Sequence, residues 1–179
     1  MPPFSRSALI ALSFLIAATG RAGAAVRHEW SVLAGGAVGV ETRTLQTVLR
    51  WGVHGEPTGD AWRRGRPALL LELTPLFIVR QTPQAHGAAF TILGRYTADG
   101  EGLRPMFTAG IGLLAADNAV PPGEFAFNFT PQGGAGLQYS RSRTAVSVEY
   151  RFQHISNNGI TNPNRGLNTH LLLVGISRR

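Results

Sequence analysis

A histidine and a serine stand two residues apart near the end of the sequence, at His154 and Ser156. Alternate side chains of an extended strand point to one side, so both groups would face the same surface. A serine hydroxyl becomes nucleophilic when a neighbouring base accepts its proton, and histidine, with a reference pKa of about 6.5, suits that task. The following residues, SNNG, offer backbone N–H groups for an oxyanion. Because Asn and Gly also favour turns, a plain loop between two strands is the alternative.

The elements that would position this pair are strands. After the first residues, the sequence lacks the charged segments of 3.6-residue period that are typical of helices. It contains eight segments rich in Val, Leu, Phe, Thr and Gly, divided by turn-forming clusters. These segments are 29–39, 43–54, 67–80, 87–97, 103–114, 125–139, 143–154 and 167–177. They predict an all-β fold, an eight-stranded antiparallel up-and-down β-barrel.

Each strand segment alternates between an apolar face and a polar face. In 143–154, Val148 and Tyr150 alternate with Glu149 and Arg151. Alternation of this kind places one set of side chains inside a barrel and the other set outside. It does not by itself say which set is inside, so it fits both a soluble barrel and a transmembrane barrel.

The composition of the two faces favours a transmembrane barrel over a soluble, lipocalin-like one. The apolar faces are wide and rich in Leu and aromatic residues, as expected of a surface that contacts lipid. The polar faces hold small residues together with charges of both signs, which would pair inside a narrow lumen. The charges expected there are Arg50, Glu72, Arg95, Glu149 and Arg151. A soluble periplasmic lipid-binding barrel is the alternative.

The N-terminal residues have the pattern of an export signal. Arg6 precedes an uncharged apolar run, ALIALSFLIAA, and RAGAA then provides small residues for cleavage. The run is about half of the roughly 20 residues that a membrane-spanning helix needs. We therefore predict a cleaved signal peptide over residues 1–24 and a single barrel domain over residues 25–179.

The counts of Cys, His and charged residues limit which cofactors and binding partners are expected. The chain has no Cys, which excludes disulfides and thiolate metal sites. No His and carboxylate cluster has ligand spacing, so no metal or other cofactor is expected. All 17 basic residues are Arg, against 10 acidic ones, and the Arg fork suits phosphate or carboxylate groups. Because the Arg residues are scattered and the chain is expected to be exported, we do not expect it to bind nucleic acid.

The run F-x-H-I-S-N-x-G-I-x-x-P-N-x-G-L-N, over residues 152–168, resembles the signature of the PagL lipid A 3-O-deacylases. The resemblance implies an eight-stranded outer-membrane barrel that removes an ester-linked acyl chain from the lipid A of lipopolysaccharide. It extends more loosely to the signal peptide, the length and the number of strands.

Carried over by position, the resemblance makes Ser156 the nucleophile and His154 the base. It places Asn157 and Gly159 in the oxyanion segment, with Asn164 as a supporting loop residue. The third member of the family triad is a Glu, and the matching residue here is Asn168. An amide oxygen can orient a histidine ring, but it does not neutralise the imidazolium that forms during catalysis. Glu149 has the wrong strand parity to replace that carboxylate.

The sequence thus predicts an outer-membrane serine esterase of a Gram-negative type of cell, whose partners are lipid A and the surrounding lipids. A homodimer is compatible with the sequence. The rival function is a catalytically weak or inactive barrel of the same family with a structural role, suggested by Asn168. The cluster WRRGR, over residues 62–66, would either contact lipid A phosphates or form a solvated loop.

Overall fold

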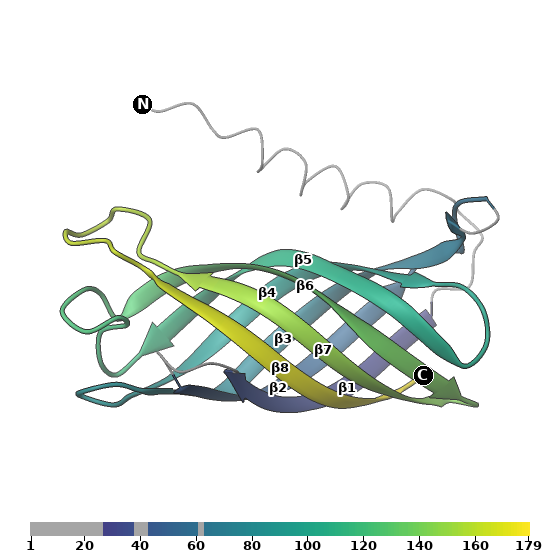
Figure 1. The fold of residues 1–179 in the computed structure, drawn as a ribbon, viewed down its shortest axis with the longest axis horizontal. Helices are drawn as coiled ribbons and strands as arrows, with labels where there is room; N and C mark the ends of the chain where they lie inside the picture. Colours follow the sequence, from purple (N-terminus) through teal and green to yellow (C-terminus); the bar gives the residue numbers. More distant parts are fainter. Residues whose placement is uncertain (1–26, 38–42, 61–62) are drawn as a thin grey trace.

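Eight antiparallel strands close into a barrel in the computed structural model, which describes residues 27–37, 43–60 and 63–179 (Figure 1). The strands are β1 (Arg27–Ala37), β2 (Arg43–His54), β3 (Gly65–Arg80), β4 (Ala85–Ala98), β5 (Leu103–Ala116), β6 (Phe127–Arg141), β7 (Thr144–Ile155) and β8 (Leu167–Arg178). Each strand pairs with the next one along the chain, and β8 pairs with β1. The fold expected from the sequence is confirmed. The predicted signal peptide, residues 1–24, lies outside the described residues.

The strand boundaries differ little from those predicted, and the largest irregularity has a clear cause. The register between β3 and β4 shifts between Thr74 and Phe77. Pro75 lies in this interval and has no N–H to donate to the ladder, so a bulge accommodates it. Within the described residues, no helix has the length and apolarity required to cross a membrane.

The polar faces of the strands point into the barrel and the apolar faces point outwards. In β7, the side chains of Glu149 and Arg151 are buried, whereas Val148 and Tyr150 are 44% and 43% exposed. A soluble barrel requires the opposite arrangement. The structure is therefore that of a transmembrane barrel, whose apolar outer surface contacts lipid. The soluble alternative is wrong.

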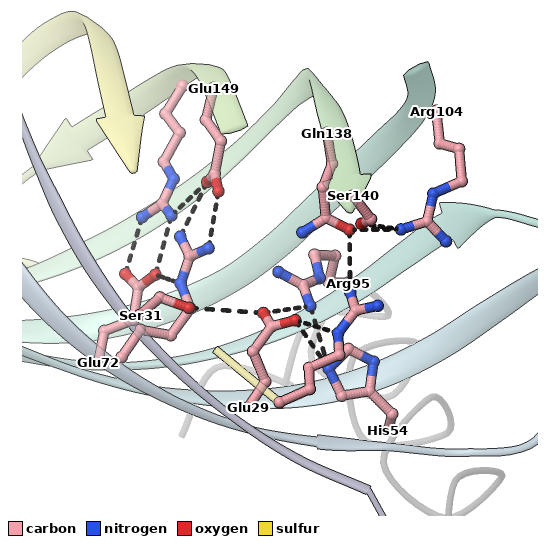
Figure 2. A network of polar contacts seen from close by, with 12 residues as sticks. Glu29, Ser31, His54, Glu72, Arg95, Arg104, Gln138, Ser140 and Glu149 are labelled. Carbon is pink, nitrogen blue, oxygen red and sulfur yellow. Dashed lines mark hydrogen bonds and ion pairs between the residues drawn. The ribbon is translucent and has the colours of Figure 1, made fainter. Parts of the chain in front are cut away.

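Two acidic and two basic side chains form a closed group of ion pairs in the lumen (Figure 2). Arg50 donates from Nε to Glu72 at 2.6 Å and from its two terminal nitrogens to Glu149 at 2.7 and 2.8 Å. Arg151 donates to Glu72 at 2.8 Å and to Glu149 at 2.7 Å. Each carboxylate thus contacts both guanidinium groups. Buried charges are tolerated when they are paired and hydrogen-bonded in this way.

A second polar group surrounds Glu29, nearer the end of the barrel that carries the C-terminus. Glu29 accepts hydrogen bonds from Arg95 at 2.8 Å and from Arg179 at 2.7 Å, and His54 Nε2 lies 3.3 Å away. Ser31 donates to the same carboxylate at 3.4 Å (Figure 2). The pairing of lumen charges predicted from the sequence is confirmed, with Glu29 as the partner of Arg95.

The other end of the barrel is filled by apolar side chains. We call this end the site rim; it carries the loops 81–84, 117–126 and 156–166, and it lies opposite the terminal rim, where the C-terminus is found (Figure 1). A cluster of buried residues closes this end, with Val120 contributed by the loop 117–126: Phe77, Val79, Ala85, Ala89, Leu114, Val120 and Ile155. We call this cluster the apolar plug. It fixes the end of β7, where the candidate catalytic residues begin.

Candidate active site

His154 lies near the end of β7 and is paired in register with Asn168 of β8. Its Nδ1 atom is 2.7 Å from the Asn168 Oδ1 atom. With a proton on Nδ1, the ring donates to this amide oxygen, and Nε2 then has a free lone pair that can accept a proton. The contact therefore orients the ring and selects the tautomer that a general base requires.

Ser156 follows β7 directly and is held by backbone hydrogen bonds to β6. The Phe129 amide donates to the Ser156 carbonyl at 2.8 Å, and the Ser156 amide donates to the Phe129 carbonyl at 3.1 Å. Between the two candidate residues, Ile155 points inwards and is completely buried in the apolar plug. Strand alternation consequently turns His154 and Ser156 to the outer side, and both are half-buried.

The serine and the histidine are placed on one side, but no hydrogen bond joins the Ser156 hydroxyl to the His154 ring among the contacts of the described residues. Such bonds are often long in proteins without substrate and shorten when the substrate binds. The structure thus brings together His154 and Asn168 in direct contact, with Ser156 beside them at the same end of the barrel.

The loop after Ser156 is closed upon itself by its own side chains. The Asn157 amide donates to Asn164 Oδ1 at 3.2 Å, and the Gly159 amide donates to Asn157 Oδ1 at 2.8 Å. The buried Asn157 side chain also donates to the Thr161 hydroxyl at 2.9 Å. Both amides of the predicted oxyanion segment therefore have acceptors inside the loop. An oxyanion can bind the Asn157 amide only by displacing Asn164.

Two residues that the sequence reasoning missed lie against this site. Gly166 has a φ of 69°, and a Cβ atom there would lie 2.7 Å from Cε1 and 3.1 Å from Nε2 of His154. Glu124, in the loop between β5 and β6, accepts hydrogen bonds from the Arg165 amide at 2.7 Å and the Gly166 amide at 3.5 Å. Gly166 is part of the motif over residues 152–168, so the motif could have identified it as a site residue. No sequence signal connects Glu124 with the loop 156–166, which is distant from it in the chain.

A second polar contact joins outward-facing side chains of β7 and β8 near this site. His170 Nδ1 lies 2.7 Å from the Tyr150 hydroxyl, and the His170 ring packs against Tyr150 and Phe152. In the strand register His170 is paired with Phe152, one outward-facing step from the His154–Asn168 pair towards the middle of the barrel, and Tyr150 lies one step further along β7. Aromatic and amphipathic rings of this kind are common where a barrel meets the membrane interface.

Residues 63–66 of the WRRGR cluster lie away from the site, and Trp62 lies outside the described residues. Arg64 pairs with Asp99 at 3.0 Å, and Arg66 donates to the Gly55 carbonyl at 3.1 Å. Both side chains are at the terminal rim, at the opposite end of the barrel from Ser156. In the described part of the chain, no three His, Cys, Asp or Glu side chains are grouped as metal ligands.

Comparison with known proteins gives one consistent family. Residues 23–177 match the family described as lipid A 3-O-deacylase (PagL). The lipid A deacylase PagL of Pseudomonas aeruginosa is 32% identical over 95 residues, which cover 51% of this chain and 53% of that protein. The chain thus matches about half the length of this relative.

Solved structures share the fold. The outer-membrane enzyme PagL has a TM-score of 0.55 at 21% identity, covering 82% of this chain and 97% of that one. The N-terminal β-barrel domain of OprF from Pseudomonas aeruginosa has a TM-score of 0.52 at 16% identity, covering 86% and 98%. The Neisserial surface protein A has a TM-score of 0.53 at 13% identity, covering 87% and 99%. The similarity to the last two extends to the barrel alone, whereas the match over residues 23–177 spans the candidate site as well, and the chain belongs to the lipid A 3-O-deacylase (PagL) family.

Proposed function

We propose that this protein is a serine esterase of the outer membrane that removes an ester-linked acyl chain from lipid A, with 3-O-deacylation as the reaction of its family. The observation that carries the proposal is the hydrogen bond from His154 to Asn168 beside an outward-facing Ser156, within a chain of this family. A polar pair of this kind on a lipid-facing surface is reached by a substrate that is itself a membrane lipid.

The reaction begins when His154 Nε2 accepts the Ser156 hydroxyl proton while the Ser156 oxygen attacks the ester carbonyl carbon. The tetrahedral intermediate collapses as the bond to the sugar oxygen breaks and His154 gives its proton to that oxygen, so the sugar departs with a free hydroxyl and an acyl-serine remains. Water then attacks the acyl-serine with His154 again as the base. The products are the free fatty acid and the regenerated serine. Asn168 orients the imidazole throughout by accepting from Nδ1.

When substrate is absent, the Asn157 amide donates to the Asn164 side-chain oxygen. The oxyanion that forms on the substrate carbonyl oxygen replaces Asn164 as the acceptor of this hydrogen bond. The Gly159 amide supports this arrangement from within the turn, where it donates to the Asn157 side chain. Asn164 therefore acts as a stand-in acceptor that keeps the Asn157 amide in position until the substrate arrives.

The acyl chain of the substrate would extend along apolar residues that surround the site. On the outer surface, Phe152 is 40% exposed, Phe127 is 38% exposed, and Ile160 of the loop is 58% exposed. In the membrane these side chains contact lipid tails, so a bound acyl chain replaces a neighbouring lipid at little cost. The sugar and phosphate groups of lipid A would stay at the site rim, among the polar loops.

The test compares lipid A from cells that export the wild-type protein, Ser156→Ala or Ser147→Ala. Ser147 lies on β7, the strand that Ser156 follows, but it is buried in the lumen, so its substitution is a matched control. Mass spectrometry should show loss of one acyl chain for the wild type and Ser147→Ala, and an intact pattern for Ser156→Ala. An unchanged pattern in all three, or a change that persists in Ser156→Ala, refutes the proposal.

A second candidate function, an inactive structural barrel of the same family, is favoured by the neutral side chain at Asn168. It predicts that Ser156 does not react with a serine-directed phosphonate probe. Covalent labelling that disappears in Ser156→Ala would eliminate this candidate.

A further inference from the structure

The backbone at the start of β8 lies against the catalytic edge of the His154 ring. Gly166 precedes β8, and its would-be Cβ position is within 3.1 Å of both Cε1 and Nε2 of His154. Nε2 is the atom that exchanges the proton with Ser156 in the proposed reaction. On the other side of Cε1, the ring is held at Nδ1 by Asn168. The imidazole is therefore confined from two sides, by a side chain and by a backbone.

The position of Gly166 depends on a carboxylate from another loop. Glu124 Oε1 accepts from the Arg165 amide at 2.7 Å, and Glu124 Oε2 accepts from the Gly166 amide at 3.5 Å. Hydrogen bonds to an ionised carboxylate are stronger than those between neutral groups. These two bonds connect the end of the loop 156–166 to the loop 117–126 across the site rim.

The loop that carries Glu124 is itself firmly anchored. The Glu124 amide donates to the Pro121 carbonyl at 3.2 Å, and the Val120 amide donates to the Phe125 carbonyl at 3.0 Å. The Val120 side chain is completely buried in the apolar plug, together with Ile155 of β7. Glu124 and His154 are consequently fixed to the same apolar cluster.

We propose that Glu124 is a positioning residue for His154: its carboxylate holds the Arg165 and Gly166 amides so that Gly166 confines the ring in the orientation that exchanges a proton with Ser156. This inference rests on the proposed esterase function. Without the carboxylate, the end of the loop loses its connection to the loop 117–126, and the Cε1–Nε2 edge of the ring loses its confinement. Because proton transfer requires a narrow range of geometry, the effect should fall on kcat.

The experiment uses the full-length protein in detergent micelles containing lipid A, with Glu124→Ala, Glu124→Gln and Glu101→Ala. Glutamine retains one carbonyl oxygen for the shorter bond from Arg165, so it tests rescue by a conservative change. Glu101 is an exposed acid in the turn between β4 and β5, at the terminal rim, and serves as the matched control. Glu124→Ala should lower kcat roughly tenfold with little change in KM. The kcat of Glu124→Gln should stay within about threefold of the wild-type value, and Glu101→Ala should have the wild-type kcat.

A second readout in the same samples separates failure of this inference from failure of the proposed function. The NMR signal of the His154 Cε1–H group reports the contact with Gly166 whether or not an acyl chain is released. It should shift in Glu124→Ala and stay unchanged in Glu101→Ala. A wild-type kcat or an unshifted signal in folded Glu124→Ala overturns the positioning role. A shifted signal in a protein whose wild type releases no fatty acid refutes the esterase function instead, and leaves the contact supported.

Discussion

Replacing Asn168 by glutamate should increase the rate of acyl release. Asn168 Oδ1 lies 2.7 Å from His154 Nδ1, so a carboxylate at this position would face the imidazolium that forms in the proposed reaction as Ser156 loses its proton. Two unit charges about 4 Å apart interact by about 1 kcal/mol in water and about 4 kcal/mol at an effective dielectric constant near 20. Asn168 is exposed and His154 half-buried, which favours the lower half of that range.

A stabilisation of about 1 to 2.5 kcal/mol corresponds to an increase of about 5-fold to 70-fold in kcat. The assay measures fatty acid released from lipid A in mixed micelles by the purified wild type, Asn168→Glu and Asn168→Gln. Glutamine adds the same length without the charge and should give no increase. The acidic limb of the pH–rate profile should also move to higher pH in Asn168→Glu, because the carboxylate favours the protonated ring.

The reasoning is refuted if folded Asn168→Glu has the wild-type kcat or a lower one. An equal gain in Asn168→Gln would show that side-chain length, rather than charge, limits the wild type. Retention of the barrel is checked by heat-modifiable mobility on a gel. Since Asn168 is exposed at the rim, we expect all three proteins to fold.

Three further predictions concern the barrel and the loop. Glu72→Ala leaves Arg50 and Arg151 with a single carboxylate between them, so it should lower the free energy of unfolding by about 3–5 kcal/mol, measured by denaturant titration in lipid vesicles. Val148→Arg places a charge on the outward face in the middle of β7 and should cost about 2–4 kcal/mol in the same titration; no loss in vesicles would contradict a lipid-facing surface. Gly166→Ala adds a Cβ 2.7 Å from His154 Cε1 at a positive φ, so kcat should fall roughly tenfold while the unfolding midpoint changes little. A lowered unfolding midpoint with an unchanged kcat would mean that Gly166 serves only the turn.

The strands and their faces were predictable because strand alternation is a local property of the sequence. Val148, Glu149, Tyr150 and Arg151 separate into two faces by position alone. Which face is inside followed from chemistry, since charges of both signs need partners and only the lumen offers them. The particular partners required the register between strands: Arg50 lies opposite Glu72 across β2 and β3, a relation that neither strand reveals by itself.

The site was predictable only in part, for physical reasons. His154 and Asn168 become neighbours because β7 and β8 are joined by the loop that contains the motif, and the family resemblance of that motif was what paired them in advance. The hydrogen bond from the Asn157 amide to Asn164 depends on the side-chain conformation of Asn164, which the residue types alone do not specify. Glu124 reaches Gly166 through the packing of two loops over the apolar plug, and such a contact between distant segments has no local signature.

The filled lumen also determines how such an enzyme would meet its substrate. Ion pairs and the apolar plug occupy the interior, and the candidate catalytic side chains face outwards at one end. Encounter is then a two-dimensional search within one leaflet, so turnover would follow the mole fraction of lipid A in that leaflet rather than its concentration in the surrounding water. Diluting lipid A with inert lipid should slow the reaction, whereas adding more membrane of the same composition should not.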